Sequence, residues 1–341
     1  MIRITWLAGA VACLCATLTI SGCEQPAPVF LSDGRPPERP AIDGGNLESQ
    51  ALRVVIEGLA DPDPRIRTNA VEVVARTKEV LLMPKVQRLL HDPIAPVRFL
   101  AAVAVGDLEY ALARNDIIQL ANESDANVKM AAAYALMKLG NADSFKVFRD
   151  AIASEDQTVR ANAALLLGKS GRRDAVRFLY WALRDDASAD KVVLQAAESI
   201  AMLGDDRIYP KLWSRLISAY ADDRVLGIRA MGALGTEEAK NALVTMLDDP
   251  VLEVRLAAAA ELGKMGDPIG EPEVLHVFKS DDLADMDPQG QQRVKVLTAL
   301  AIGEIGSKSL TKHLPELMAD PSRQVRLAAA KAVLQSGGNG R

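Results

Sequence analysis

Side chains that commonly hold metal ions or act as bases are scarce in this chain. Its 341 residues include three histidines, His91, His276 and His313, and three cysteines that all fall within the first 23 residues. The histidines lie far apart, and none is followed by a glutamate. A transition-metal site needs several such ligands close together, and no serine-nucleophile or phosphate-binding glycine motif is present. We therefore expect no metal site, no cofactor and no catalytic residue.

Carboxylates are concentrated in one segment, residues 280–292, which contains Asp281, Asp282, Asp285 and Asp287. Four carboxylates could bind Ca²⁺. Their spacing does not match an EF-hand loop, however, and Pro288 interrupts the segment. A solvated loop is the favoured interpretation, and calcium binding stays open.

The first 23 residues have the layout of a secretory signal. Arg3 supplies a positive start, residues 4–20 are apolar, and Ser21-Gly22-Cys23 follows. This ending resembles the lipobox of bacterial lipoproteins. The resemblance implies cleavage between Gly22 and Cys23, with two acyl chains on Cys23, and two chains suffice for a stable anchor. An uncleaved membrane helix and an ordinary signal peptide are the alternatives.

Residues 24–46 are rich in proline and glycine, a composition that cannot build a core. We predict that residues 23–46 form the lipidated cysteine and a flexible tether, which as a coil spans roughly 25–30 Å. Glu24 follows the cysteine, where an aspartate would resemble an inner-membrane retention signal. The periplasmic face of the outer membrane is therefore the favoured location if the source is Gram-negative.

A self-similar unit fills residues 47–337. Its clearest form, Asp-Pro-x-x-x-Val-Arg, occurs at residues 92–98, 249–255 and 320–326, and residues 61–67 differ only by an isoleucine. Alignment on the valine gives nine positions spaced 28 to 40 residues apart, namely Ile66, Val97, Val128, Val159, Val192, Leu226, Val254, Val294 and Val325. A period in this range is typical of a solenoid.

Each unit has the pattern of two antiparallel helices. Four residues after the aligned position stands an alanine in eight of nine units, and eight residues after it an aliphatic side chain always follows, so that these columns share one helical face. Asp-Pro suits a helix start. The glycines twelve residues after the aligned position suit a left-handed helix end; they are Gly140, Gly171, Gly204, Gly266, Gly306 and Gly337. A second helix then follows, as at residues 175–183.

With this pattern, residues 47–337 resemble HEAT-like repeats of the phycobilisome-lyase type. The resemblance implies an all-α, right-handed superhelical solenoid of about nine two-helix repeats, which as a rod or arc would be roughly 80 Å long. It also implies that five arginines pair with acids of the same or adjacent repeats: Arg67, Arg98, Arg160, Arg255 and Arg326. The fifth, sixth and eighth repeats depart from the pattern, with Val193, Gly227 and Lys295 in place of the arginine.

Two kinds of enzyme share this architecture. Deoxyhypusine hydroxylase holds two irons with His-Glu pairs, and this chain has no such pair. Phycobilin lyases act on a tetrapyrrole, which a secreted lipoprotein would not meet, so a lyase-type enzyme is the weakest alternative. We expect a protein that is not an enzyme.

Large apolar side chains supply the candidate partner-binding residues. The second helix of each repeat is expected to line the concave side. Six large apolar residues point away from the alanine column, and we predict that they form an exposed ridge. The alternative is that neighbouring helices bury them. The six are Phe99, Leu100, Met130, Tyr134, Leu165 and Leu194. Trp181 and Trp213 belong to an aromatic cluster in repeats five and six, which either packs between repeats or contacts a partner.

The expected function is that of a membrane-anchored scaffold or adaptor of the bacterial cell envelope, which binds an unidentified protein along its concave face. The alternative is a structural factor that binds envelope polymers such as peptidoglycan. A net charge of −5 disfavours nucleic acid, and no small-molecule substrate is expected. The predicted divisions are a signal peptide at 1–22, the tether at 23–46, the solenoid at 47–337 and a disordered tail at 338–341.

Overall fold

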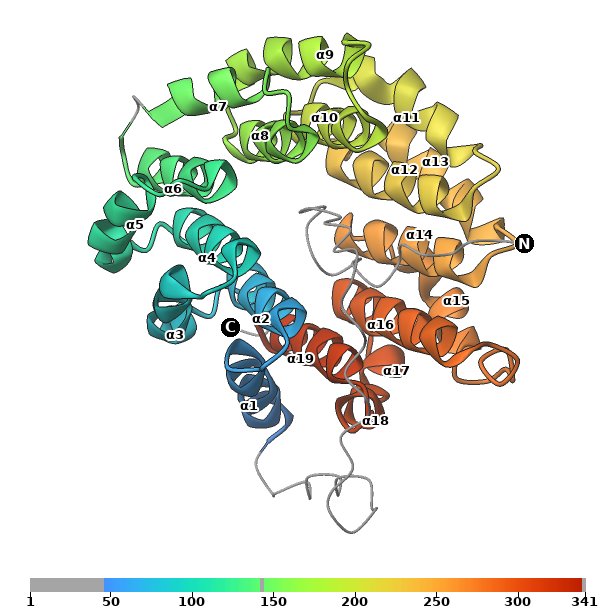
Figure 1. Cartoon of the computed structure of the whole chain (residues 1–341). Coiled ribbons are helices and arrows are strands. Elements are labelled where there is room, and N and C mark those ends of the chain that lie inside the picture. Colours follow the sequence, from blue (N-terminus) through green and yellow to red (C-terminus); the bar gives the residue numbers. More distant parts are fainter. Residues whose placement is uncertain (1–45, 142–143, 339–341) are drawn as a thin grey trace.

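The computed structural model describes residues 46–141 and 144–338, and all regular elements of that part are helices (Figure 1). The predicted signal peptide, Cys23 and tether lie outside the described residues, as do residues 339–341. No helix in the described ranges is long and apolar enough to cross a membrane.

Nine inner helices carry the aligned columns and surround the centre of the molecule (Figure 1). We number the repeats by them: α2 (Pro64–Thr77), α4 (Ala95–Asp107), α6 (Ala126–Lys138), α8 (Gln157–Lys169), α10 (Asp190–Met202), α12 (Ala221–Leu234), α14 (Leu252–Lys264), α16 (Pro288–Ile305) and α19 (Arg323–Gly338). Gly337 lies within α19 and does not end the helix as predicted.

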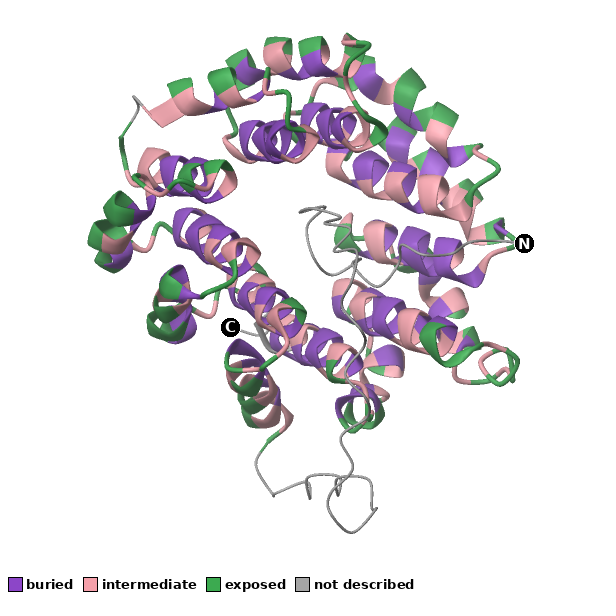
Figure 2. Ribbon diagram, viewed as in Figure 1, coloured by how far each residue is buried: buried purple, intermediate pink, exposed green. Residues whose placement is uncertain are grey.

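The outer helices are mostly shorter and are flanked by 3₁₀ turns. They are α1 (Leu47–Leu59), α3 (Met83–Arg88), α5 (Arg114–Leu120), α7 (Phe145–Ala151), α9 (Val176–Arg184), α11 (Tyr209–Leu216), α13 (Glu237–Thr245), α15 (Glu271–His276) and a broken helix, α17 (Lys308–Thr311) and α18 (Leu314–Met318). The predicted second helices are thus on the outer wall, and the expectation that they line the concave side is wrong. Figure 2 shows exposed residues along this outer wall.

The two ends of the solenoid meet. Helix α1 packs against α19 as well as α2, and α19 packs against α2. Arg323 donates to both carboxylate oxygens of Asp61 at 2.7 and 2.8 Å, and a Cβ added to Gly58 would lie 3.1 Å from Leu327 Cδ2. Helix α1 therefore lies between two inner helices, as α7, α9 and α13 do. The nine repeats form a closed ring (Figure 1), and the expected open rod or arc is wrong.

Closure explains why the end repeats are apolar. An open solenoid needs terminal repeats with a polar outer face. Here Ala51 and Val55 of α1 are fully buried, and so are Ala328 and Ala330 of α19. The first and last repeats therefore protect each other's apolar faces from water.

The sixth repeat is in a different register from the one predicted. Arg224 donates two hydrogen bonds to Asp249, at 2.7 and 2.8 Å, 25 residues further on. Arg67 bonds Asp92 at the same sequence separation. Asp223, and not Leu226, therefore occupies the aligned position, and the intervals to Val192 and Val254 both become 31 residues. The repeat does not lack its arginine.

The corrected register places Gly227 in the alanine column of repeat six. A Cβ there would lie 2.9 Å from the Cβ of Arg215 and 3.3 Å from the backbone nitrogen of Leu216. Helix α11 therefore approaches α12 too closely for even an alanine side chain. This explains why repeat six has a glycine in the alanine column.

A second column of small residues allows neighbouring inner helices to approach each other closely. Nine residues after the aligned position, five repeats have a glycine: Gly106, Gly168, Gly232, Gly263 and Gly303. A Cβ on Gly168 would lie 2.7 Å from that of Ser199 on the next inner helix, and one on Gly303 would lie 2.8 Å from Ala332 Cα. Close spacing of the inner helices bends the wall, because the outer helices do not approach each other in this way.

Of the five arginines predicted to pair with acids of the same or adjacent repeats, four do so. We call these pairs the arginine ladder. Arg67, Arg98 and Arg160 bond acids 25 residues ahead, at 2.6–3.2 Å, and Arg255 bonds Glu273 at 2.7 Å. Arg326 instead donates to the carbonyl oxygens of Asp320 and Pro321. Side chains therefore join neighbouring repeats by charge-assisted hydrogen bonds as well as by apolar packing.

Two inner helices end in a strained conformation. Lys78 and Glu109 have φ angles of 56° and 49°, and they stand twelve residues after the aligned position, where other repeats have a left-handed glycine.

We predict that Lys78→Gly raises the free energy of unfolding by about 0.5–1 kcal/mol, because a side chain in this region is strained. Thermal unfolding followed by circular dichroism measures the change. The control is Thr77→Gly, one residue earlier inside the helix, which should destabilise by about 1 kcal/mol, because it lowers helix propensity and removes the hydrogen bond from Thr77 Oγ1 to the Val73 carbonyl.

Candidate binding surface

The predicted ridge is largely buried. Phe99, Leu100, Met130, Tyr134 and Leu165 all lie in the core, and Leu194 is half-buried. The ring of Tyr134 packs where a Cβ on Gly106 would lie, 2.7 Å away, and its hydroxyl donates to Asp107 at 2.7 Å. The exposed-ridge interpretation is therefore wrong, and the alternative, burial between neighbouring inner helices, is what the structure shows. The reason is the close approach of those helices.

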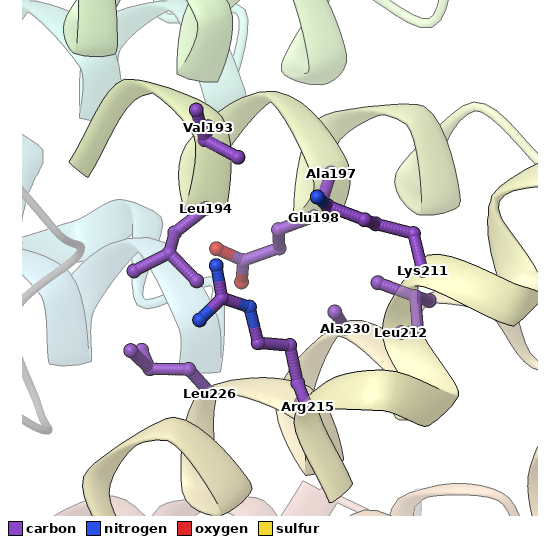
Figure 3. Close-up of a pocket in the computed structure, with 10 residues that line it drawn as sticks. Val193, Leu194, Ala197, Glu198, Lys211, Leu212, Arg215, Leu226 and Ala230 are labelled. Carbon is purple, nitrogen blue, oxygen red and sulfur yellow. The ribbon is translucent and has the colours of Figure 1, made fainter. Parts of the chain in front are cut away.

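Leu194 borders a small cavity between α10, α11 and α12 (Figure 3). The cavity has room for about one water molecule, ~20 Å³. Glu198 and Arg215 point toward one another across it in Figure 3. Glu198 also accepts from Arg229 at 3.0 Å, so the charges at this place stabilise the joint between repeats and leave no space for a ligand.

The aromatic cluster, in contrast, reaches the surface. Trp181 on α9 is 47% exposed, Trp213 on α11 is 38% exposed, and Tyr220, which precedes α12, is 75% exposed. Trp213 stacks on Tyr209 with ring centroids 6.3 Å apart. We call Tyr180, Trp181, Tyr209, Trp213 and Tyr220 the outer aromatic surface, because the helices that carry most of it lie on the outer wall (Figure 1).

Arginines cover the flanks of this surface. The guanidinium of Arg160 lies 5.2 Å from the Trp181 ring centroid, and those of Arg184 and Arg207 lie 5.2 and 5.4 Å from that of Tyr180. The sequence reasoning did not single out these cation–π contacts. Only the contact of Arg184 with Tyr180 had a signal in the sequence, because residues four apart share one helical face. Arg160 and Arg207 come from other elements, and only the tertiary structure brings them to the rings.

The contacts hold Trp181 in place. Arg160, beneath it, is buried and donates to Asp185 at 2.6 Å and to Ser188 at 2.9 Å. The hydrogen bond from Arg160 lowers the pKa of Asp185 below its usual value. Asp185 therefore stays charged at neutral pH and holds Arg160 in place beside Trp181. An exposed aromatic side chain whose position is already fixed by contacts within the protein loses less conformational entropy when it binds a partner.

Charge also fixes the turn before α11. Arg207 hydrogen-bonds Asp205 through Nε at 2.8 Å, and this contact lowers the pKa of Asp205. Burial, with the nearby charge of Asp205, raises the pKa of Tyr180. Tyr180 is therefore neutral at physiological pH and presents an aromatic face between two guanidinium groups.

The acidic segment has local structural roles. Asp287 caps α16 by accepting from the backbone of Gly290 at 2.8 Å, and His276 contacts Asp282 at 2.9 Å. In the described part of the chain, no group of three or more His, Cys, Asp or Glu side chains is arranged to hold a metal ion.

A family model for HEAT repeats matches residues 82–157, 146–226 and 210–286, which together make up more than half of the chain. The chain belongs to the HEAT-repeat family. A comparison with curated protein sequences found no match. The family assignment agrees with the paired helices and their short period.

Several solved structures are similar to this HEAT-repeat protein. Human deoxyhypusine hydroxylase is 19% identical over 78% of this chain and 98% of that one, with a TM-score of 0.38. The CpcE–CpcF complex of phycocyanin lyase from Nostoc is 22% identical over 65% and 94%, with a TM-score of 0.40. Kap121p is 13% identical over 84% of this chain and 37% of that one, with a TM-score of 0.35. Likenesses of this degree say nothing about activity or partners.

Proposed function

We propose that this HEAT-repeat protein is a non-enzymatic scaffold of the bacterial cell envelope, anchored by lipid on Cys23, and that it binds a protein partner through the outer aromatic surface. The observation that carries the binding proposal is the exposure of Trp181, Trp213 and Tyr220 in a chain with only 4% aromatic residues. The proposed site lies on the convex wall, not on the concave face that the sequence suggested.

The composition of the surface favours a protein partner. Tryptophan, tyrosine and arginine are the residues most enriched at binding hot spots. Ile217, 68% exposed, lies close in sequence to Trp213 and adds an apolar contact. Arg184, which lies over Tyr180, is exposed, so the partner surface should combine apolar groups with acidic side chains.

The test is the double variant Trp181→Ala with Trp213→Ala. We expect chemical crosslinking in whole cells to capture a defined protein band with the unaltered chain, and at least tenfold less of it with the variant, because hot-spot tryptophans each contribute about 2 kcal/mol or more. The melting temperature should fall only modestly, since neither side chain belongs to the buried core.

A matched control is Ile118→Ala, which removes an apolar side chain of similar exposure, 46%, from the outer helix α5 of a different repeat. Its capture of the band should equal that of the unaltered protein. If both variants capture the band equally well, the outer aromatic surface is not the binding site. Retention of muropeptides without any protein band would contradict the adaptor proposal and support binding to peptidoglycan.

A further inference from the structure

The two most exposed large apolar side chains in the described ranges are leucines, not tryptophans. Leu81 is 90% exposed and Leu112 is 78% exposed. Each stands fifteen residues after the aligned position of its repeat, in the 3₁₀ turn that joins an inner helix to the next outer helix. Val80 is exposed beside Leu81. Because α2 and α4 pack side by side, these turns are neighbours. We call Val80, Leu81 and Leu112 the apolar rim.

The described chain begins on the same rim. Leu81 and Leu112 lie at the ends of inner helices. Helix α1 runs antiparallel to the inner helices, because its last residues, near Gly58 and Asp61, meet the first residues of α19 at Leu327 and Arg323. The start of α1, where Asn46 caps the backbone of Ser49 at 2.8 Å, is therefore on the rim where the inner helices end. Asn46, the first described residue, therefore lies beside the apolar rim.

Exposed basic side chains flank the apolar rim: Lys78, Lys85 and Arg114, together with exposed Glu109. The opposite rim, where inner helices begin, carries an aspartate at or next to most helix starts: Asp61, Asp63, Asp92, Asp125, Asp156, Asp190, Asp249, Asp287 and Asp320. Several of these aspartates are paired with a basic side chain, as Asp61 is with Arg323, Asp92 with Arg67 and Asp249 with Arg224. An anionic lipid surface therefore attracts the basic side chains beside the apolar rim.

The remaining repeats limit the apolar rim to one edge. The position of Leu81 and Leu112 holds Asp174, Arg207 and Glu238 in repeats four to six, and an apolar residue returns only at Ile269 in repeat seven. Exposed leucines therefore concentrate at the edge of the ring nearest to the start of α1.

We propose that the apolar rim rests on the lipid bilayer, with Leu81 and Leu112 entering the headgroup region and Lys78, Lys85 and Arg114 beside anionic lipids. This orientation rests on the proposed anchoring through Cys23. Apolar side chains flanked by basic ones are suited to a membrane interface, and Asn46, which lies beside the rim, follows Cys23 by only 23 residues. Tyr220, next to the start of α12, then faces away from the bilayer and stays open to a partner.

The test uses the mature, lipidated protein in vesicles of phosphatidylethanolamine and phosphatidylglycerol. A single cysteine is introduced as Leu81→Cys, Leu112→Cys or Ile94→Cys and labelled with an environment-sensitive fluorophore. Ile94 is the control, since it is an exposed apolar residue at the N-cap of α4, on the opposite rim. We expect the probes at 81 and 112 to shift to shorter wavelength and to be quenched by lipid-borne nitroxides several-fold more than the probe at 94.

Each other outcome overturns the orientation. Equal quenching at the three positions, with the protein still floating with the vesicles, would overturn it and leave the anchor intact. A wavelength shift without quenching by lipid would mean contact with a protein, such as a second copy of this chain. A protein that does not float at all would overturn the anchor and the orientation together.

A variant separates this inference from the partner site. Leu81→Ser with Leu112→Ser should reduce lipid quenching of a probe at Val80→Cys several-fold, whereas Ile94→Ser should leave it unchanged. The same leucine variant should still capture the crosslinked protein band in detergent. Loss of the band with unchanged quenching would show that the apolar rim contacts the partner and not the bilayer.

Discussion

Shortening Leu327 to alanine is expected to destabilise the protein by about 2–5 kcal/mol, the usual cost of removing a buried leucine side chain. Leu327 lies in the last inner helix and is only 2% exposed. It owes part of this burial to Gly58 of the first helix, whose Cβ position is 3.1 Å from Leu327 Cδ2. The measurement is the free energy of unfolding from denaturant titration.

The matched control is Leu256→Ala. Leu256 takes the same position in repeat seven, two residues after the aligned valine, and is fully buried between ordinary neighbours. A closed ring predicts similar losses for the two variants. In an open solenoid Leu327 would face water, and its replacement would cost almost nothing. A small loss at Leu327 beside a large one at Leu256 would therefore contradict ring closure.

Crosslinking gives an independent measure of closure. In Asp61→Cys with Arg323→Cys, a short bis-maleimide should join the two thiols within one molecule, because these side chains form a hydrogen-bonded pair across 262 residues of sequence. Replacing Arg323 by a cysteine while keeping Asp61 supplies the control, since it should give no internal crosslink.

Replacing Arg224 by methionine is expected to cost about 3 kcal/mol, the lower end of the range for breaking a buried ion pair. The side chains of Arg224 and Asp249 are 11% and 5% exposed. Without the arginine, Asp249 keeps its hydrogen bond from the backbone of Val251, at 2.9 Å, but its charge is left without a partner. Thermal and denaturant unfolding both measure the loss.

Two controls test the register of repeat six. Arg67→Met removes the equivalent contact in repeat one and should cost a similar amount. Arg326→Met removes only hydrogen bonds to the carbonyl oxygens of Asp320 and Pro321, so about 1 kcal/mol is expected. If Arg224→Met behaves like a neutral surface change, Arg224 is not the ladder residue of repeat six.

The register error in repeat six has a simple origin. A search for an aliphatic residue followed by arginine passes over Asp223-Arg224, because Asp223 replaces the usual valine. In the structure its carboxylate accepts from Ser218 at 2.8 Å. Two signals in the sequence nevertheless pointed to it: the 31-residue interval on either side, and Gly235, which ends α12 with a φ of 67°.

The buried ridge was a different kind of error. Phe99, Met130 and Tyr134 point away from the alanine column, and a single helix pair gives no reason for water to be excluded from them. Their burial depends on how closely the next inner helix approaches. Glycines nine residues after the aligned position permit that approach, but the sequence alone did not show that they face a neighbouring helix.

The sequence by itself determined the repeat and the number of helical pairs, and the family resemblance implied most of the arginine pairs, because these features depend on contacts within one unit or between adjacent units. Small residues at fixed intervals, Asp-Pro helix starts and glycine ends are local rules that recur in many of the repeats. Only the tertiary structure decided that the ring closes, that the aligned helices form its inner wall, and that Trp181 and Leu81 are exposed while Tyr134 is not. Closure follows from the small angle between successive repeats, summed over nine of them, and no single repeat encodes that sum.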